Sequence, residues 1–219
     1  MGNSRWLAAL ALAVSGATYA QGAEIVATVI DQHGKPVADA VIVAVPADGS
    51  LRTPSKARDE VVDQVDKQFV PKVQVVLVGT PVTFPNNDNV RHQVYSFSPA
   101  KRFELPLYAG TPAQPIVFDK PGVVVLGCNI HDWMIGFIYV SDSPYFAKTG
   151  TDGKATLAEL PPRAYLVRVW HPQLDVAEDA TRKPVDVTRA RRLDIGWTLN
   201  LKPEVRVRRA PVSDRVGRY

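Results

Sequence analysis

Cysteine and methionine are almost absent from this chain. It holds one cysteine, Cys128, and two methionines, one of them the initiator, among 219 residues. A single cysteine excludes an intramolecular disulfide, and with it a disulfide-stapled fold. No long segment places apolar residues at helical spacing, and 18 prolines would interrupt helices often. No later segment is apolar enough to cross a membrane. The fold class predicted is therefore all-β, and 46% hydrophobic residues suffice for a buried core.

The first twenty residues are typical of a cleaved secretory signal. Arg5 precedes an apolar stretch from Trp6 to Val14 that is too short to span a bilayer. Small residues follow, and we expect cleavage after Ala20. The alternative is a buried first strand or helix. Export would place the protein in the periplasm, where an unpaired thiol is idle, intermolecular or bound to a metal.

Three candidate metal ligands stand together in one short loop. Cys128, His131 and Met134 have the spacing Cys-x2-His-x2-Met and directly follow the apolar run Val123 to Leu126. A thiolate, an imidazole and a thioether on a tight turn between strands can all face one point. Soft sulfur ligands with imidazole favour copper, and two histidines, a cysteine and a weak axial methionine are the blue-copper set. This loop lacks the second histidine.

The missing histidine is expected upstream, on a neighbouring strand. His92 fits because it follows a turn rich in Asn and Asp and begins an alternating strand. Each ligand has a structural alternative: a histidine bonded within its strand, an inert buried cysteine, a surface histidine, or a methionine that fills the core. His33 and His171 lie outside the ligand-bearing segment and are interpreted as structural or exposed. Asp132 is expected on the surface.

Residues beside the ligands are expected to support them. Asn87 and Gln93 flank His92 closely and could orient the ligands. A second group has two interpretations, either an apolar patch around the exposed edge of the ligand histidine or ordinary packing under the loop; its members are Pro85, Trp133, Ile135 and Phe137.

These motifs together resemble a cupredoxin. The likeness covers residues 60 to 142 and is carried by Val82-Thr83-Phe84, the Asn/Asp turn before His92, Lys120-Pro121-Gly122 and the ligand loop. The short ligand spacing resembles the amicyanins most. The resemblance implies a Greek-key β-sandwich over 55–143. It also implies one copper ion, cycling between Cu(I) and Cu(II), whose ligands are His92, Cys128, His131 and Met134.

The flanking segments resemble two halves of a second sandwich. Residues 29–42 resemble the opening of carboxypeptidase-regulatory-type domains, which are prealbumin-like, and 149–170 resemble their second half. Strands are expected over 24–30 and 40–45, as a hairpin-like unit, and in the alternating segment 189–201, with Trp197 in the core. We expect an Ig-like or prealbumin-like sandwich split between 21–54 and 144–203, with the cupredoxin inserted where loops are exposed.

The resemblance implies an exported carrier of single electrons. It implies transient docking with a redox protein such as a c-type cytochrome or an amine dehydrogenase, and proteins called methylamine utilisation proteins share this composite layout. Four ligands leave no open position for a substrate or water, so no enzyme is expected. The alternatives are a copper carrier or sensor without redox turnover, and a cell-envelope adaptor built on the prealbumin-like halves.

The end of the chain carries a charge bias. Residues 189–219 include nine Lys or Arg and three Asp or Glu, whereas the whole chain has a net charge of +4. A basic tail over 204–219 could bind an acidic partner protein or an anionic membrane surface. The simpler interpretation is a solvated, partly disordered end. No nucleic acid is expected as a partner.

Overall fold

The structure is a computed structural model, and it describes residues 22–50 and 58–203. The predicted signal, its cleavage after Ala20 and the basic tail 204–219 lie outside the described residues. The regular structure in the described part consists of seventeen β-strands and one turn of 3-10 helix, η1 (Glu178–Thr181). The predicted all-β fold class is thus confirmed. Among the residues described, no helix reaches the length and apolar content that a membrane crossing requires.

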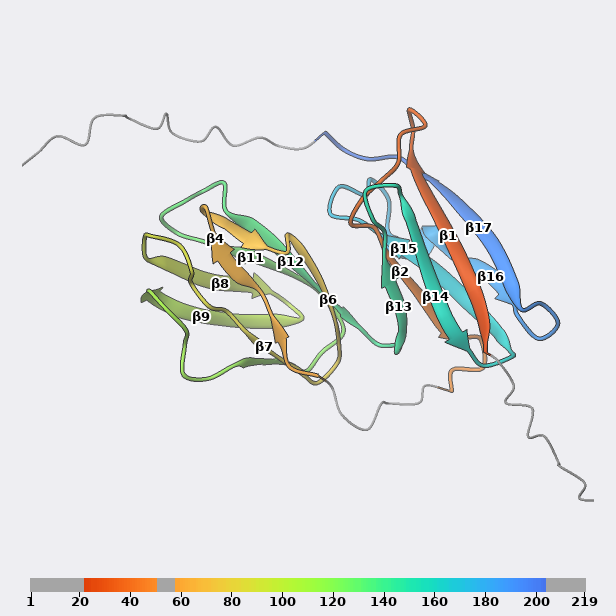
Figure 1. The fold of residues 1–219 in the computed structure, drawn as a ribbon, viewed down its shortest axis with the longest axis horizontal. Helices are drawn as coiled ribbons and strands as arrows, with labels where there is room; N and C mark the ends of the chain where they lie inside the picture. Colours follow the sequence, from red (N-terminus) through yellow and green to blue (C-terminus); the bar gives the residue numbers. More distant parts are fainter. Residues whose placement is uncertain (1–21, 51–57, 204–219) are drawn as a thin grey trace, which may run out of the picture.

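The strands form two β-sandwiches, which Figure 1 shows beside each other. The first is called here the split sandwich, because its strands come from both ends of the described chain. Its sheets have the orders β14-β1-β17 and β13-β2-β15-β16. The strands are β1 (Ala23–Asp31), β2 (Val41–Pro46), β13 (Tyr145–Lys148), β14 (Lys154–Leu160), β15 (Ala164–Trp170), β16 (Lys183–Asp186) and β17 (Arg192–Leu199).

The second sandwich, called here the inserted sandwich, lies in the chain between β2 and β13. A five-stranded sheet of order β6-β12-β11-β8-β9 packs against a three-stranded sheet of order β10-β7-β3, and β4 and β5 form a separate pair. The strands are β3 (Glu60–Val61), β4 (Asp63–Val65), β5 (Gln68–Val70), β6 (Val73–Leu77), β7 (Thr80–Thr83), β8 (His92–Ser98), β9 (Lys101–Tyr108), β10 (Ile116–Phe118), β11 (Gly122–Gly127) and β12 (Ile135–Ser141).

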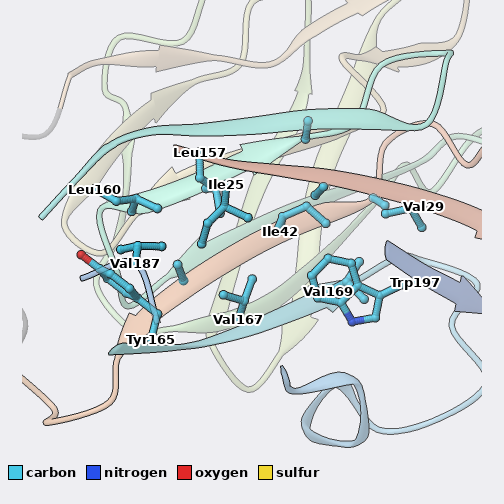
Figure 2. Packing of buried hydrophobic residues seen from close by; sticks show 14 of the residues in the cluster. Ile25, Val29, Ile42, Leu157, Leu160, Tyr165, Val167, Val169, Val187 and Trp197 are labelled. Carbon is cyan, nitrogen blue, oxygen red and sulfur yellow. The ribbon is translucent and has the colours of Figure 1, made fainter. Parts of the chain in front are cut away.

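An apolar core fills the split sandwich (Figure 2). Alternate side chains of β1, including Ile25 and Val29, point into it and meet Ile42 of β2 and Val167 of β15. Trp197 of β17 is 5% exposed and closes this core, as the alternation of its segment predicts. In β1 and β17 the alternating sequence pattern therefore predicts correctly which side chains face the core.

The pairing of the first two strands differs from the prediction. A hairpin-like unit was expected, but β1 pairs with β14 and β17 whereas β2 lies in the opposite sheet, so that prediction is wrong. The physical reason is burial: β2 buries almost every side chain, so it needs packing partners on both of its faces. The segment 32–40 therefore carries the chain from one layer to the other.

An apolar contact joins the two sandwiches. Val41 and Val43 of β2 are buried together with Val73 of β6 and Tyr139 of β12. The ring of Trp170 lies 5.5 Å from that of Tyr139, centroid to centroid. The second face of β2 is therefore buried against the inserted sandwich.

Charged side chains line the edge of this contact. The guanidinium of Arg168 bonds the carboxylates of Asp142 at 2.6 Å and Glu178 at 2.7 Å, and its own side chain is only 12% exposed. Lys148 donates to the carbonyl oxygen of Val73 at 2.9 Å and pairs with Asp39 at 2.7 Å. The bonds to Asp142 and to the Val73 carbonyl join β15 and β13 of the split sandwich to the inserted one, whereas Glu178 and Asp39 belong to the split sandwich itself.

Candidate metal centre

The ligand loop closes a hairpin between two paired strands. Gly127, the last residue of β11, pairs with Ile135, the first residue of β12. Within the loop, the backbone N–H of Met134 donates to the carbonyl of His131 at 2.9 Å. Alternate residues of β11 point into the core of the inserted sandwich, and Cys128 continues that inward series. The loop therefore turns its thiol inward rather than into solvent.

His92 reaches the same end of the sheet from the neighbouring strand. Tyr95 of β8 lies opposite Gly127 of β11 in the antiparallel pair, so the beginning of β8 lies beside the ligand loop. His92 is the first residue of β8, and its side chain is fully buried. The sheet thus brings together two residues that are far apart in the sequence.

Three ligand atoms form a nearly regular triangle. The Sγ atom of Cys128 lies 3.8 Å from Nδ1 of His92 and 3.9 Å from Nδ1 of His131, and the two Nδ1 atoms are 3.2 Å apart. The centre of such a triangle is about 2.1 Å from each atom, within the range of about 2.0–2.3 Å for metal–nitrogen and metal–sulfur bonds. Among the residues described, these three form a group with metal-ligating spacing. One ion fits between them.

The fourth predicted ligand lies in the same core. Met134 is 1% exposed and belongs to the buried cluster that contains Cys128. The other two histidines lie elsewhere: His33 is exposed, and His171 is buried with its Nδ1 accepting the N–H of Gln173 at 3.2 Å. Asp132 is exposed, as expected. The donor set that converges is therefore imidazole, thiolate and imidazole, with a thioether buried nearby.

Asp88 supports the site and was not predicted to do so. Its Oδ2 lies 2.9 Å from Nε2 of His92, and its side chain is 6% exposed. Because this bond uses Nε2, it fixes the ring with Nδ1 turned toward Cys128. The backbone N–H of Lys67 also donates to Asp88, at 2.7 Å. A buried carboxylate thus holds the buried histidine in its ligating orientation.

The two residues expected to orient ligands have other partners. Asn87 donates to the carboxylate of Asp63 at 2.8 Å, and Gln93 donates to Glu104 at 2.6 Å. Asn86 takes part instead, because its Oδ1 accepts the backbone N–H of Asp88 at 3.0 Å. The hydrogen bond from Asp88 to Asn86 therefore fixes the backbone of the turn before β8 at Asp88. The sequence signal was the position of Asp88 four residues before His92, within a run of four Asn and Asp residues that offered no means of choosing.

The electrostatics of the site favour ligation. Burial of Asp88 opposes its ionisation, but hydrogen bonds from His92 and from the N–H groups of Lys67 and Asn89 outweigh it and lower the pKa of the carboxyl. Burial, followed by the nearby His92 and Lys67, lowers the pKa of His131. A lowered pKa keeps the His131 imidazole neutral at pH 7, which is the form that binds a metal.

Four residues near the ligand loop were expected either to form an exposed apolar patch or to pack beneath the loop, and the structure shows some of each: Pro85, Trp133, Ile135 and Phe137. Phe137 packs, since its ring lies 6.0 Å from that of Trp170 at the contact between sandwiches. Ile135 is 41% exposed. The ring of Trp133 lies 5.2 Å from that of His131, while Pro85 is half-buried. Ile135 alone is a substantially exposed apolar member of this group.

Two histidines and a cysteine at one point of a β-sandwich are the arrangement that type 1 copper sites use. Solved structures similar to this chain include the purple cupredoxin from Nitrosopumilus maritimus, with 25% identity over 38% of this chain and 100% of that one and a TM-score of 0.34. The copper-containing nitrite reductase from Thermus scotoductus has 25% identity over 53% of this chain and 28% of that one, with a TM-score of 0.37. An oxidised amicyanin mutant has 20% identity, over 47% and 99% of the two chains, with a TM-score of 0.35. No family model and no curated protein matches the chain.

Proposed function

We propose that this chain is an exported type 1 copper protein that carries single electrons between redox partners. The observation that carries the proposal is the triangle of His92, Cys128 and His131, whose centre is about 2.1 Å from each ligand atom. Copper bound there would supply one-electron chemistry between Cu(I) and Cu(II). Met134, buried in the same core, is proposed as the weak axial ligand.

The chain itself contributes a fixed ligand frame. His92 stands on β8 and is held by Asp88, while Cys128 and His131 sit in a hairpin loop closed by the Gly127–Ile135 pair. Ligands held by paired strands and buried bonds move little when the charge of the site changes. Little rearrangement then accompanies the arrival or departure of an electron, so transfer is fast.

Burial favours electron transfer over copper delivery. His92 is 0% exposed and Cys128 is 3% exposed, whereas His131 is half-buried. A carrier that hands over its metal must let a new ligand replace the thiolate, and here that thiolate is covered. Four ligands also leave no open position for substrate or water, and we therefore propose no enzymatic activity.

The setting of this site is part of the proposal. The signal-like first twenty residues support export to the periplasm. A c-type cytochrome or an amine dehydrogenase is the partner class proposed from the cupredoxin resemblance, and docking is proposed to be transient. The split sandwich is proposed to be prealbumin-like, in the composite layout of methylamine utilisation proteins. The basic tail 204–219 is proposed as a contact for an acidic partner.

Optical and magnetic spectra of the copper-loaded, signal-free protein test the function. We expect an intense thiolate-to-copper band and a narrow copper hyperfine splitting, because the Cys128 thiolate would bind directly. Both should vanish in Cys128→Ser and persist in the matched control His33→Asn, which changes an exposed histidine outside the site. A wild-type protein without the band would overturn the proposal. Tight retention of Cu(I) with no stable Cu(II) form would instead support a copper carrier.

A further inference from the structure

One half of an outer sheet face in the inserted sandwich is uncovered. At β6 and β12 this face lies against the split sandwich, where Tyr139 is 2% exposed. Over β8, β11 and the start of β12 the same face presents Phe97, Val125 and Ile135, which are 74%, 43% and 41% exposed. These three residues and Tyr95 are called here the β8–β11 face. They line one shallow pocket of about 460 Å³, and a contiguous apolar patch of this kind marks an interaction surface.

An aromatic contact leads from this face to the ligand cysteine. The rings of Phe97 and Tyr95 are 5.2 Å apart, centroid to centroid. The Tyr95 ring in turn covers Gly127, so closely that a Cβ atom at that position would lie 2.8 Å from the ring. Only glycine permits this approach. Gly127 is bonded to Cys128, so two packed rings and one peptide unit join the solvent to the thiolate.

The chemistry of the β8–β11 face defines the kind of partner that fits it. Asp132 is the one charged side chain among the residues that line the pocket, and the exposed Arg102 and Glu104 of β9 flank the pocket on the same face, opposite Phe97 and Tyr95. A partner that placed charges on the apolar centre of this face would bury them without counter-charges, whereas an apolar partner surface with a polar rim would match both the centre and its charged edge. The face also continues directly into the contact with the split sandwich, where the same sheet already packs against apolar protein surface.

We propose that the β8–β11 face docks a one-electron carrier protein with an apolar contact surface, and that Tyr95 couples the docked carrier to Cys128. This rests on the proposed function, which supplies the redox site. One electron leaves the reduced carrier and one is gained at the oxidised site, with no proton or atom transferred. Interfaces of redox carriers are small and weak, which suits a surface of a few exposed side chains.

Reduction kinetics of the copper-loaded, signal-free protein test the docking. The probes are a reduced soluble c-type cytochrome, which must dock, and hexaammineruthenium(II), which needs no apolar surface. Phe97→Ser and Val125→Ser should each lower the second-order rate constant with the cytochrome about tenfold, as truncation of an energetically dominant interface side chain does. The rate with ruthenium should not change. Val117→Ser is the matched control, because Val117 is 45% exposed but lies on β10, in the other sheet.

A second variant tests the role of Tyr95 separately from docking. Tyr95→Leu should lower the rate within the complex at saturating cytochrome, where the docking strength no longer limits the rate, whereas Phe97→Ser should raise the concentration of cytochrome at half-saturation and Tyr95→Phe should keep both values. The rate with the cytochrome should also vary little with salt, because the contact is apolar and the charges of Arg102 and Glu104 at its edge have opposite signs.

Several results would overturn the docking proposal. They are unchanged cytochrome kinetics in Phe97→Ser and Val125→Ser, an equal loss in Val117→Ser, or no reaction with the cytochrome while ruthenium reduces the site. A steep fall in rate with salt would assign docking to charged groups such as the basic tail. A dimer in sedimentation that Phe97→Ser dissociates would assign the face to a second copy of the chain. Failure of the proposed function is distinct, because the wild-type protein would then lack the copper band before any kinetics.

Discussion

The two sandwiches differ in what they bury. The split sandwich buries mainly hydrophobic residues, with a few polar ones such as Thr149 and Thr181. Polar atoms of its core are paired: the Tyr165 hydroxyl donates to the carbonyl of Pro161, and Trp197 Nε1 donates to that of Thr181. The inserted sandwich buries polar side chains as well, among them Gln64, Asn86 and His92. One core is built for stability, and the other gives up apolar packing at one end to assemble a site.

Buried polar groups in the inserted sandwich mostly hold the turn before His92. Gln64 donates to the carbonyl of Pro85 at 3.1 Å, and Asn86 donates to those of Val90 and Tyr108 at 3.0 and 2.8 Å. Because folding exchanges hydrogen bonds with water for bonds within the protein, each such bond adds only about 0.5–1.5 kcal/mol to the free energy of unfolding. The contact with the largely apolar split sandwich through β2 therefore has a physical purpose, since the site region gains less stability from its own core.

Trp197→Ala should produce the largest effect. It should lower the free energy of unfolding and leave the metal centre unchanged. Trp197 is 5% exposed in the core of the split sandwich, and truncation of a buried tryptophan costs about 3–5 kcal/mol of the free energy of unfolding. Urea unfolding followed by circular dichroism measures the loss. The copper band should keep its position wherever the protein is folded.

The exposed neighbour Thr198 provides the control for this change. Thr198→Ala should alter the free energy of unfolding by less than about 0.5 kcal/mol. If Trp197→Ala shifted the copper band in the folded protein, the separation of roles between the two sandwiches would be wrong.

Asp88→Asn should have the opposite pattern of effects, because it changes the properties of the metal centre. An asparagine oxygen can still accept the Nε2–H of His92, so the change removes charge while keeping the shape. Loss of such a supporting carboxylate lowers metal affinity by about 10- to 100-fold. Because a negative charge favours Cu(II) over Cu(I), the reduction potential should rise. Competition with a Cu(II) chelator and redox titration measure the two effects.

Asp63→Asn is the control for Asp88→Asn. The Asp63 carboxylate accepts a hydrogen bond from Asn87 in the same turn, but the bond to His92 is made by Asp88. Asp63→Asn should leave both affinity and potential close to those of the wild type. Equal affinities for Asp88→Asn and wild type would show that the carboxylate does not tune the site.

The smallest effect is expected from Asp31→Asn, in a turn of the split sandwich. Hydrogen bonds from the backbone N–H of Lys35, and also of His33, lower the pKa of Asp31 below its ordinary value of 3.8. The unfolded chain therefore takes up this proton first as the pH falls. The stabilisation is complete above the ordinary pKa and is lost as the pH falls through the lower, folded-state pKa.

Acid unfolding of the metal-free protein measures this contribution. Asp31→Asn should make stability less dependent on pH below about pH 4, and copper binding at neutral pH should not change. A variant whose stability falls with acid as steeply as that of the wild type would contradict the assignment.

The core-facing sides of the strands could be predicted from the sequence, because apolar residues at every second position indicate which side of a strand is buried. The alternation in 24–30 and in 193–199 placed the core-facing sides of β1 and β17, and the spacing of Cys128, His131 and Met134 placed the ligand loop. Which strands pair could not be predicted in the same way. The pattern of β1 is equally compatible with a hairpin to β2 and with a place between β14 and β17.

Two features needed the tertiary structure. The continuous apolar run of β2 indicates burial on both faces, but it does not say that the second covering surface is another sandwich. Asp88 could not be selected from its turn, because Asn86, Asn87, Asp88 and Asn89 offer similar side chains and the fold alone decides which one meets His92.

The parallel pairing of β1 with β17 also sets the order in which the molecule can be completed during synthesis. Glu24 pairs with Arg192 and Ala44 with Tyr145, so the first strands made must wait for partners from the last part of the chain. All strands of the inserted sandwich emerge within that interval, and its contacts are closer in sequence. Long-range pairing of this kind is slow. The half that contains the candidate metal centre can thus fold first, while the split sandwich closes only after the chain is nearly complete.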